Sequence, residues 1–153
     1  MIKFDKYQMP ICEEELTFGM VEKLAYIDGS NNLAVISALS GAPVEWLAKV
    51  SAKQIIELIQ TLHWLTSEKI IAIMQCFEEQ PKGVLDLEAE RYLAFTQLSS
   101  DSNTIFETRA IAVACFFGEF QKERLAERIT EIREMRAQKV FGLSNFFLSS
   151  LKR

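Results

Sequence analysis

Residues 51–65 read SAKQIIELIQTLHWL, and this stretch carries the clearest structural signal in the chain. Ser51 and Gln54 stand three residues apart, which is the spacing of a capping box at the start of a helix. Apolar residues then recur three and four positions apart, so that they share one face of an α-helix: Ile55, Leu58, Ile59, Leu62 and Leu65. The sequence therefore predicts a helix over residues 52–65.

The segments before this helix also have helical spacing, interrupted by glycine, asparagine and proline. Residues 1–12 are predicted to be an irregular or strand-like lead-in, and residues 13–27 form a helix with an apolar repeat of three and four. The turn-forming residues 28–32 end that helix. Two short helices, 33–39 and 44–50, then complete the N-terminal part of the chain.

The stretch 70–77, IIAIMQCF, suits a buried strand or a short helix equally well by pattern, and its β-branched residues slightly favour a strand. Beyond it, four more helices are predicted, over residues 85–98, 104–117, 121–138 and 140–151. The polar residues 99–103 form a connector between the first two. Single glycines, including Gly142, are interpreted as turns. We therefore expect a single mainly α domain over 1–153, folded as a compact bundle of about six or seven helices. The pattern also allows one short strand or hairpin near 70–77 and the N-terminus.

Composition narrows the class of protein. The chain has 153 residues, 49% of them hydrophobic and 25% charged, which suits one globular core. Its net charge is -4 and its basic residues are interspersed with glutamates, so we do not expect nucleic acid as a partner. Three distant cysteines argue against a disulfide framework and favour a reducing cytoplasm. No apolar run suits a signal peptide or a membrane span, so we expect an unexported protein without a membrane partner.

Catalytic and metal-binding patterns are weak. His63 is the only histidine, which excludes a multi-histidine metal site and leaves any catalytic triad dependent on this one ring. The acidic run Glu13–Glu15 stands at a predicted helix start, where carboxylates complement the helix dipole. No glycine-rich phosphate loop is present. We expect no catalytic residue, cofactor or metal.

Apolar side chains at the C-terminus exceed what one helix face can bury. They point in several directions around the final helix, which indicates either burial on all sides or docking on a partner. The charged segment 121–138 has a narrow row of apolar residues. This row suits either of two contacts, one with the core and one with a second copy of the chain in a homo-oligomer. The candidate partner-binding residues are Phe141, Phe146, Phe147 and Leu151, with Trp46 and Trp64 as further aromatic anchors.

The order of segments resembles that of the small tail-assembly chaperones of tailed bacteriophages. The resemblance is carried by residues 14–19 (EELTFG), 33–47 (LAVISALSGAPVEWL) and 50–59 (VSAKQIIELI), and more loosely by 84–88, 108–114 and 145–148. It implies a non-enzymatic factor of the host cytoplasm that binds tape-measure or tail-tube proteins and keeps their hydrophobic helices soluble during assembly. Related proteins are virion components, which is the alternative function; a small helical enzyme is the third.

Overall fold

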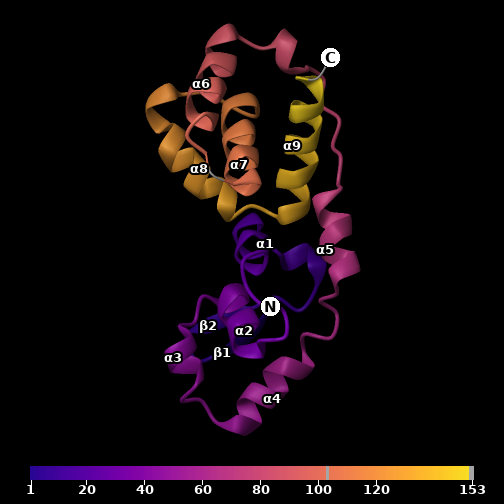
Figure 1. The fold of residues 1–153 in the computed structure, drawn as a ribbon, viewed down its shortest axis with the longest axis vertical. Helices are drawn as coiled ribbons and strands as arrows, with labels where there is room; N and C mark the ends of the chain where they lie inside the picture. The colour runs from indigo at the N-terminus through magenta and orange to yellow at the C-terminus, as the bar shows by residue number, and fades with distance from the viewer. Residues whose placement is uncertain (103, 152–153) are drawn as a thin grey trace.

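A computed structural model of the chain describes residues 1–102 and 104–151, and Figure 1 shows its fold. The described residues form an N-terminal hairpin and nine α-helices, so the prediction of a mainly α fold is confirmed. The hairpin pairs β1 (Ile2–Phe4) with β2 (Tyr7–Met9) in antiparallel register. The helices are α1 (Phe18–Leu24), α2 (Asn32–Ser40), α3 (Val44–Leu47), α4 (Ala52–Gln60), α5 (Ser67–Met74), α6 (Ala89–Ser99), α7 (Ile105–Phe116), α8 (Leu125–Arg133) and α9 (Ala137–Ser150).

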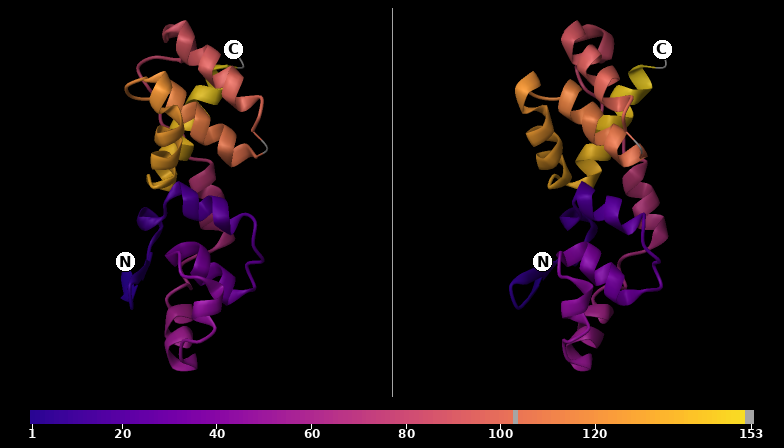
Figure 2. Two further views of the ribbon diagram at one scale, coloured as in Figure 1. Left: turned by 90° about the vertical axis from the view of Figure 1, so that its left-hand side faces the viewer. Right: turned by 60° about the vertical axis from the view of Figure 1, so that its left-hand side comes forward.

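The helices form two groups along the long axis of the molecule (Figures 1 and 2). The hairpin and α1–α4 make the N-terminal group, while α6, α8 and α9 surround α7 in the C-terminal group. Helix α7 is the centre because residues 110–116 are all buried, as an apolar helix surrounded by others must be. Helix α5 runs along the side of the molecule and packs against α9.

Helix α1 joins the two groups into one core. Its Phe18 ring packs 5.1 Å from the ring of Phe141 on α9 and 6.0 Å from that of Phe106 on α7, measured between centroids. The backbone N–H of Phe18 donates to the carbonyl of Met135 at 2.9 Å, and that of Ala137 donates to the carbonyl of Leu16 at 2.8 Å. The start of α1 is therefore fixed to the start of α9.

These backbone contacts correct two predicted helices. The expected helix 13–27 begins as a 3₁₀ turn at Glu13–Glu15 and restarts at α1, because Thr17 is extended, caps α1 and forms a β-bridge with Arg136. The expected helix 121–138 is broken at the same bridge: a 3₁₀ turn at Lys122–Arg124 leads into α8, and α9 starts separately at Ala137. The described residues hold nine α-helices against the six or seven expected, and α5 is the one that the predicted helices do not include.

The ambiguous segment 70–77 is helical over residues 70–74, and no part of it is a strand. Thr66 caps α5 by accepting a hydrogen bond from the backbone N–H of Lys69. Within α5, Ile73 is buried while Ile71 is 52% exposed, which is the alternation of a helix lying on a surface. The only strands in the described residues are those of the N-terminal hairpin, so the β-branched residues of α5 have no sheet to join.

Several helix ends also differ from the predictions. Helix α4 ends at Gln60 and a turn follows, in which the Thr61 hydroxyl donates to the carbonyl of Leu58 at 2.7 Å. Gly142 is not a turn: it lies buried inside α9, where a Cβ would stand 3.0 Å from the Cβ of Glu78. The missing side chain lets the segment after α5 lie against α9, and the backbone N–H of Glu78 donates to the carbonyl of Gly142.

Arg91 on α6 stabilises the C-terminal end of α7. Its Nη1 donates to the carbonyls of Gly118 and Cys115, at 2.9 and 3.4 Å, and its Nε pairs with Glu88. We expect Arg91→Met to keep most of the packing and to lower the free energy of unfolding by about 1–3 kcal/mol, because two carbonyls lose a charged donor. Urea denaturation measures this change. The matched control is Arg124→Met, whose pair with Glu127 is exposed, so we expect little change in the free energy of unfolding.

Candidate functional site

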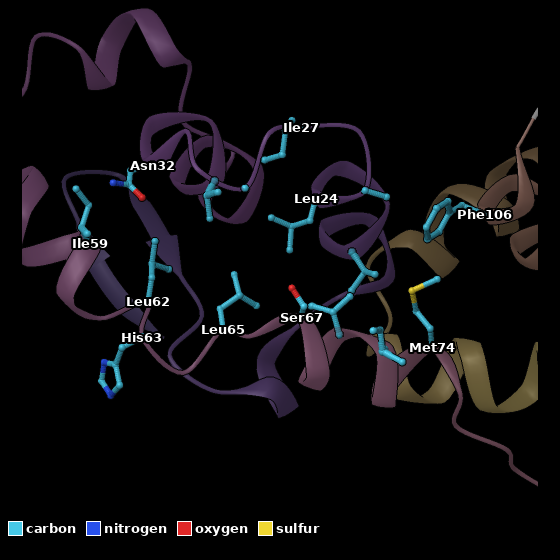
Figure 3. Close-up of a pocket in the computed structure, with 16 residues that line it drawn as sticks. Leu24, Ile27, Asn32, Ile59, Leu62, His63, Leu65, Ser67, Met74 and Phe106 are labelled. Atoms are coloured by element: carbon cyan, nitrogen blue, oxygen red, sulfur yellow. The ribbon is translucent and has the colours of Figure 1, made fainter.

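An apolar pocket of about 600 Å³ lies between α1 and α2 on one side and the α4–α5 segment on the other (Figure 3). We call it the apolar pocket throughout. Helix α7 closes one end through Phe106. Its lining residues are Val21, Leu24, Ala25, Ile27, Gly29, Asn32, Val35, Ile59, Leu62, His63, Leu65, Ser67, Ile70, Ile71, Met74 and Phe106.

Two rows of side chains face each other across the pocket. Figure 3 shows Leu24 and Ile27 pointing in from the α1 side, and Leu62 and Leu65 from the opposite side. These four side chains are only partly buried although they pack against the core. Leu24 is the last residue of α1 and Ile27 follows it, while Leu62 and Leu65 lie in the segment that connects α4 to α5.

Polar groups in the pocket are few, and none of the lining side chains is an acid, a lysine or an arginine. The polar lining residues are Asn32, Ser67 and His63. The His63 ring lies away from the facing leucines in Figure 3, with its Nδ1 2.8 Å from the carbonyl of Gln60. The pocket therefore offers burial for apolar groups and no nucleophile–base pair.

The remaining titratable groups are used locally. In the part of the chain that the structure describes, no three histidine, cysteine or acidic side chains gather into a metal-binding cluster. Glu15 accepts from the N-terminal ammonium and from the backbone N–H of Ile11, while Glu13 pairs with Lys69 at 3.7 Å. Burial raises the pKa of the Cys115 thiol to about 12, so it stays protonated at neutral pH.

The six residues predicted to bind a partner lie in two parts of the molecule, four at α9 and two in the N-terminal half, and none of them lines the apolar pocket. The expectation is corrected at Phe141 and Phe147: their side chains are 0% and 2% exposed, because α7 and neighbouring rings cover them, and they have no surface to offer a partner. Phe146 on α9 and Leu151 directly after it are half-buried. The two tryptophans are half-buried in the N-terminal half, Trp46 against the rings of Phe4 and Tyr7 and Trp64 in the turn after α4.

Comparison of the chain with family models, curated proteins and solved structures found no match. Within residues 1–102 and 104–151, no helix is both long and apolar enough to cross a membrane. The functional argument therefore depends on the apolar pocket itself. Sequence reasoning identified its leucines and isoleucines as helix stripes but did not place them together, since the pocket joins residues from Val21 to Phe106.

Proposed function

We propose that the chain is a non-enzymatic protein-binding factor that holds an amphipathic helix of another protein by its apolar side chains. The observation that carries this proposal is the apolar pocket, whose lining has no charged residue and whose facing leucines are only partly buried. An amphipathic helix presents apolar residues at positions three and four apart, which is the arrangement that fits between two rows of aliphatic side chains.

A helix suits this pocket better than a small polar ligand does. Sites for small molecules place several polar groups around an apolar cavity to fix the orientation of the ligand. Here the polar lining is limited to Asn32, Ser67 and His63, and the histidine ring lies away from the centre. Burial of apolar surface, at about 25 cal/mol per Å², is therefore the interaction that the pocket provides.

The resemblance to tail-assembly chaperones supplies the class of partner. We propose that the bound helix belongs to a tape-measure or tail-tube protein, and that binding keeps its apolar surface out of water during assembly in the host cytoplasm. The alternative, a structural component of the virion, would use the same pocket in a permanent contact. The two functions differ in whether the chain stays in the mature particle.

Ile71 provides a direct test of the pocket because it lines the pocket and is 52% exposed. We expect Ile71→Asp to weaken partner binding at least about tenfold, since a carboxylate would be buried against apolar side chains. The matched control is Ile56→Asp on α4, which is 54% exposed and does not line the pocket. The retained partner is measured by pull-down of tagged variants that are first shown to melt alike.

The same pull-down, followed by mass spectrometry of the free pool and of purified particles, separates the functions. A helical tail protein recovered from the free pool, with the chain missing from particles, supports a chaperone. Recovery of the chain in particles supports the virion component. Recovery of metabolic enzymes alone, or equal partner binding by the Ile71 and Ile56 variants, contradicts the proposal.

A further inference from the structure

Arg109 lies beside one end of the apolar pocket. Figure 3 shows Phe106 and Met74 at that end, and Arg109 stands three residues after Phe106 on the same side of α7. Its Nη1 donates to the side-chain oxygens of Ser144 and Asn145, at 3.1 and 2.5 Å. The Asn145 amide in turn donates to the carbonyl of Met74, so that one side chain separates Arg109 from a pocket residue.

The guanidinium group of Arg109 has no acidic partner within 4.0 Å among the described residues. Burial lowers its pKa and is the only cause of that shift, yet an arginine remains charged at neutral pH. Arg133 of α8, by contrast, pairs with Glu22 of α1 at 3.1 Å. Arg109 is thus a partly buried cation whose recorded contacts are neutral: the oxygens of Ser144 and Asn145, and the Phe141 ring, whose centroid lies 5.6 Å from Cζ.

The acidic groups near this end are used elsewhere. Glu78, on the segment after α5, pairs with Lys139 of α9. Glu107 stands two residues before Arg109, on a different side of α7, and lines another pocket together with Thr104 and Arg133. Arg109 therefore places a positive charge next to this end without lining the pocket, and no carboxylate among the described residues pairs with it.

We propose that the partner helix carries an acidic side chain just beyond its apolar face and that this carboxylate binds Arg109. The inference rests on the proposed function, because it names the chemistry of the helix that the apolar pocket receives. A helix that fills this uncharged lining must present an uncharged apolar face to it. The cation beyond one end of the lining favours an acidic side chain directly after that face. A charged partner also satisfies the guanidinium more fully than two neutral oxygens do, since hydrogen bonds between ions are the stronger kind.

A displayed library of amphipathic helical peptides tests the inference with a defined probe. The peptides are about 18 residues long, which is enough for a marginally stable helix, and are selected on the full chain. Peptides that lose binding to the Ile71→Asp chain are kept. We expect them to share a glutamate or aspartate at one end of their apolar face.

The peptide supplies the decisive variant, because its substitution leaves the protein intact. Replacing the shared acid by its amide is expected to weaken binding to the wild-type chain by about tenfold, within the range for charged pairs at interfaces. It should leave binding to Arg109→Gln unchanged. Arg124→Gln is the control for a loss of positive charge on the surface, because Arg124 is 57% exposed and does not line the apolar pocket.

The outcomes separate the two proposals. If selected peptides need Ile71 but bind equally well with acid or amide, the role of Arg109 is overturned and the helix-binding function stands. If the amide weakens binding to Arg109→Gln as much as to the wild type, the acid has another partner and the inference fails. If no selected peptide depends on Ile71, the proposed function itself fails.

Discussion

Phe141→Ala is expected to lower the free energy of unfolding by about 3–5 kcal/mol, the range for removing a buried aromatic ring. The Phe141 side chain is 0% exposed and packs against Phe18 of α1 and Phe106 of α7. It is thus the ring at which α1, α7 and α9 meet. Alanine would leave a cavity at this junction and remove a contact between the two helix groups. Marginally stable proteins lose a large part of their stability at such a position.

The matched control is Phe146→Ala on the same helix. Phe146 is half-buried and packs against Phe77, which is 57% exposed, so its loss should cost about 1–2 kcal/mol. Chemical denaturation of both variants, followed by circular dichroism, gives the two values. Equal destabilisation by the two substitutions would mean that Phe141 is not the central contact between the helix groups.

This pair of residues also marks the limit of the sequence pattern. Phe141, Phe146 and Phe147 are all predicted to be candidate anchors. The sequence pattern of an apolar residue is the same whether a neighbouring helix or a partner protein covers it. The covering surface comes from α1 and α7, more than twenty residues away in sequence. Burial by distant elements is a tertiary effect that helical periodicity does not contain.

Local signals predicted the helices well where a side chain caps the first turn. Ser51 accepts a hydrogen bond from the backbone N–H of Gln54, as their spacing indicated, and Thr104 accepts one from the backbone N–H of Glu107. The breaks at Thr17 and Arg136 could not be predicted in the same way, because the two residues pair with each other across more than a hundred positions. The strand preference at α5 failed since a strand needs a neighbour to pair with.

The apolar pocket was predictable only in its parts. Leu62 and Leu65 belong to the stripe that the sequence assigned to one helix, and Leu24 and Ile27 to another. The turn after Gln60 and the new helix at Ser67 redirect the second stripe toward the first. The apolar spacing was the available signal, but which residues face each other depends on how α5 packs against α9.

Asn145 holds that packing in place. Its Nδ2 donates to the carbonyls of Met74 and Cys76, at 3.0 and 2.6 Å, and its Oδ1 accepts from Arg109. These three bonds join α9 and α7 to the end of α5, where the last carbonyls of a helix lack partners within the helix. The side chain therefore fixes one wall of the apolar pocket and orients the arginine beside it.

Asn145→Ala should lower the free energy of unfolding by about 2–4 kcal/mol, because it removes three hydrogen bonds, one of them to a cation. Hydrogen exchange is the sharper measurement: we expect amides of α5 to exchange faster while those of α7, surrounded by the C-terminal group, keep most of their protection. Gln138→Ala is the control on α9, with an expected change within about 0.5 kcal/mol. Unchanged exchange in α5 would show that Asn145 does not hold this wall, and peptide binding to the variant would then remain at the wild-type level.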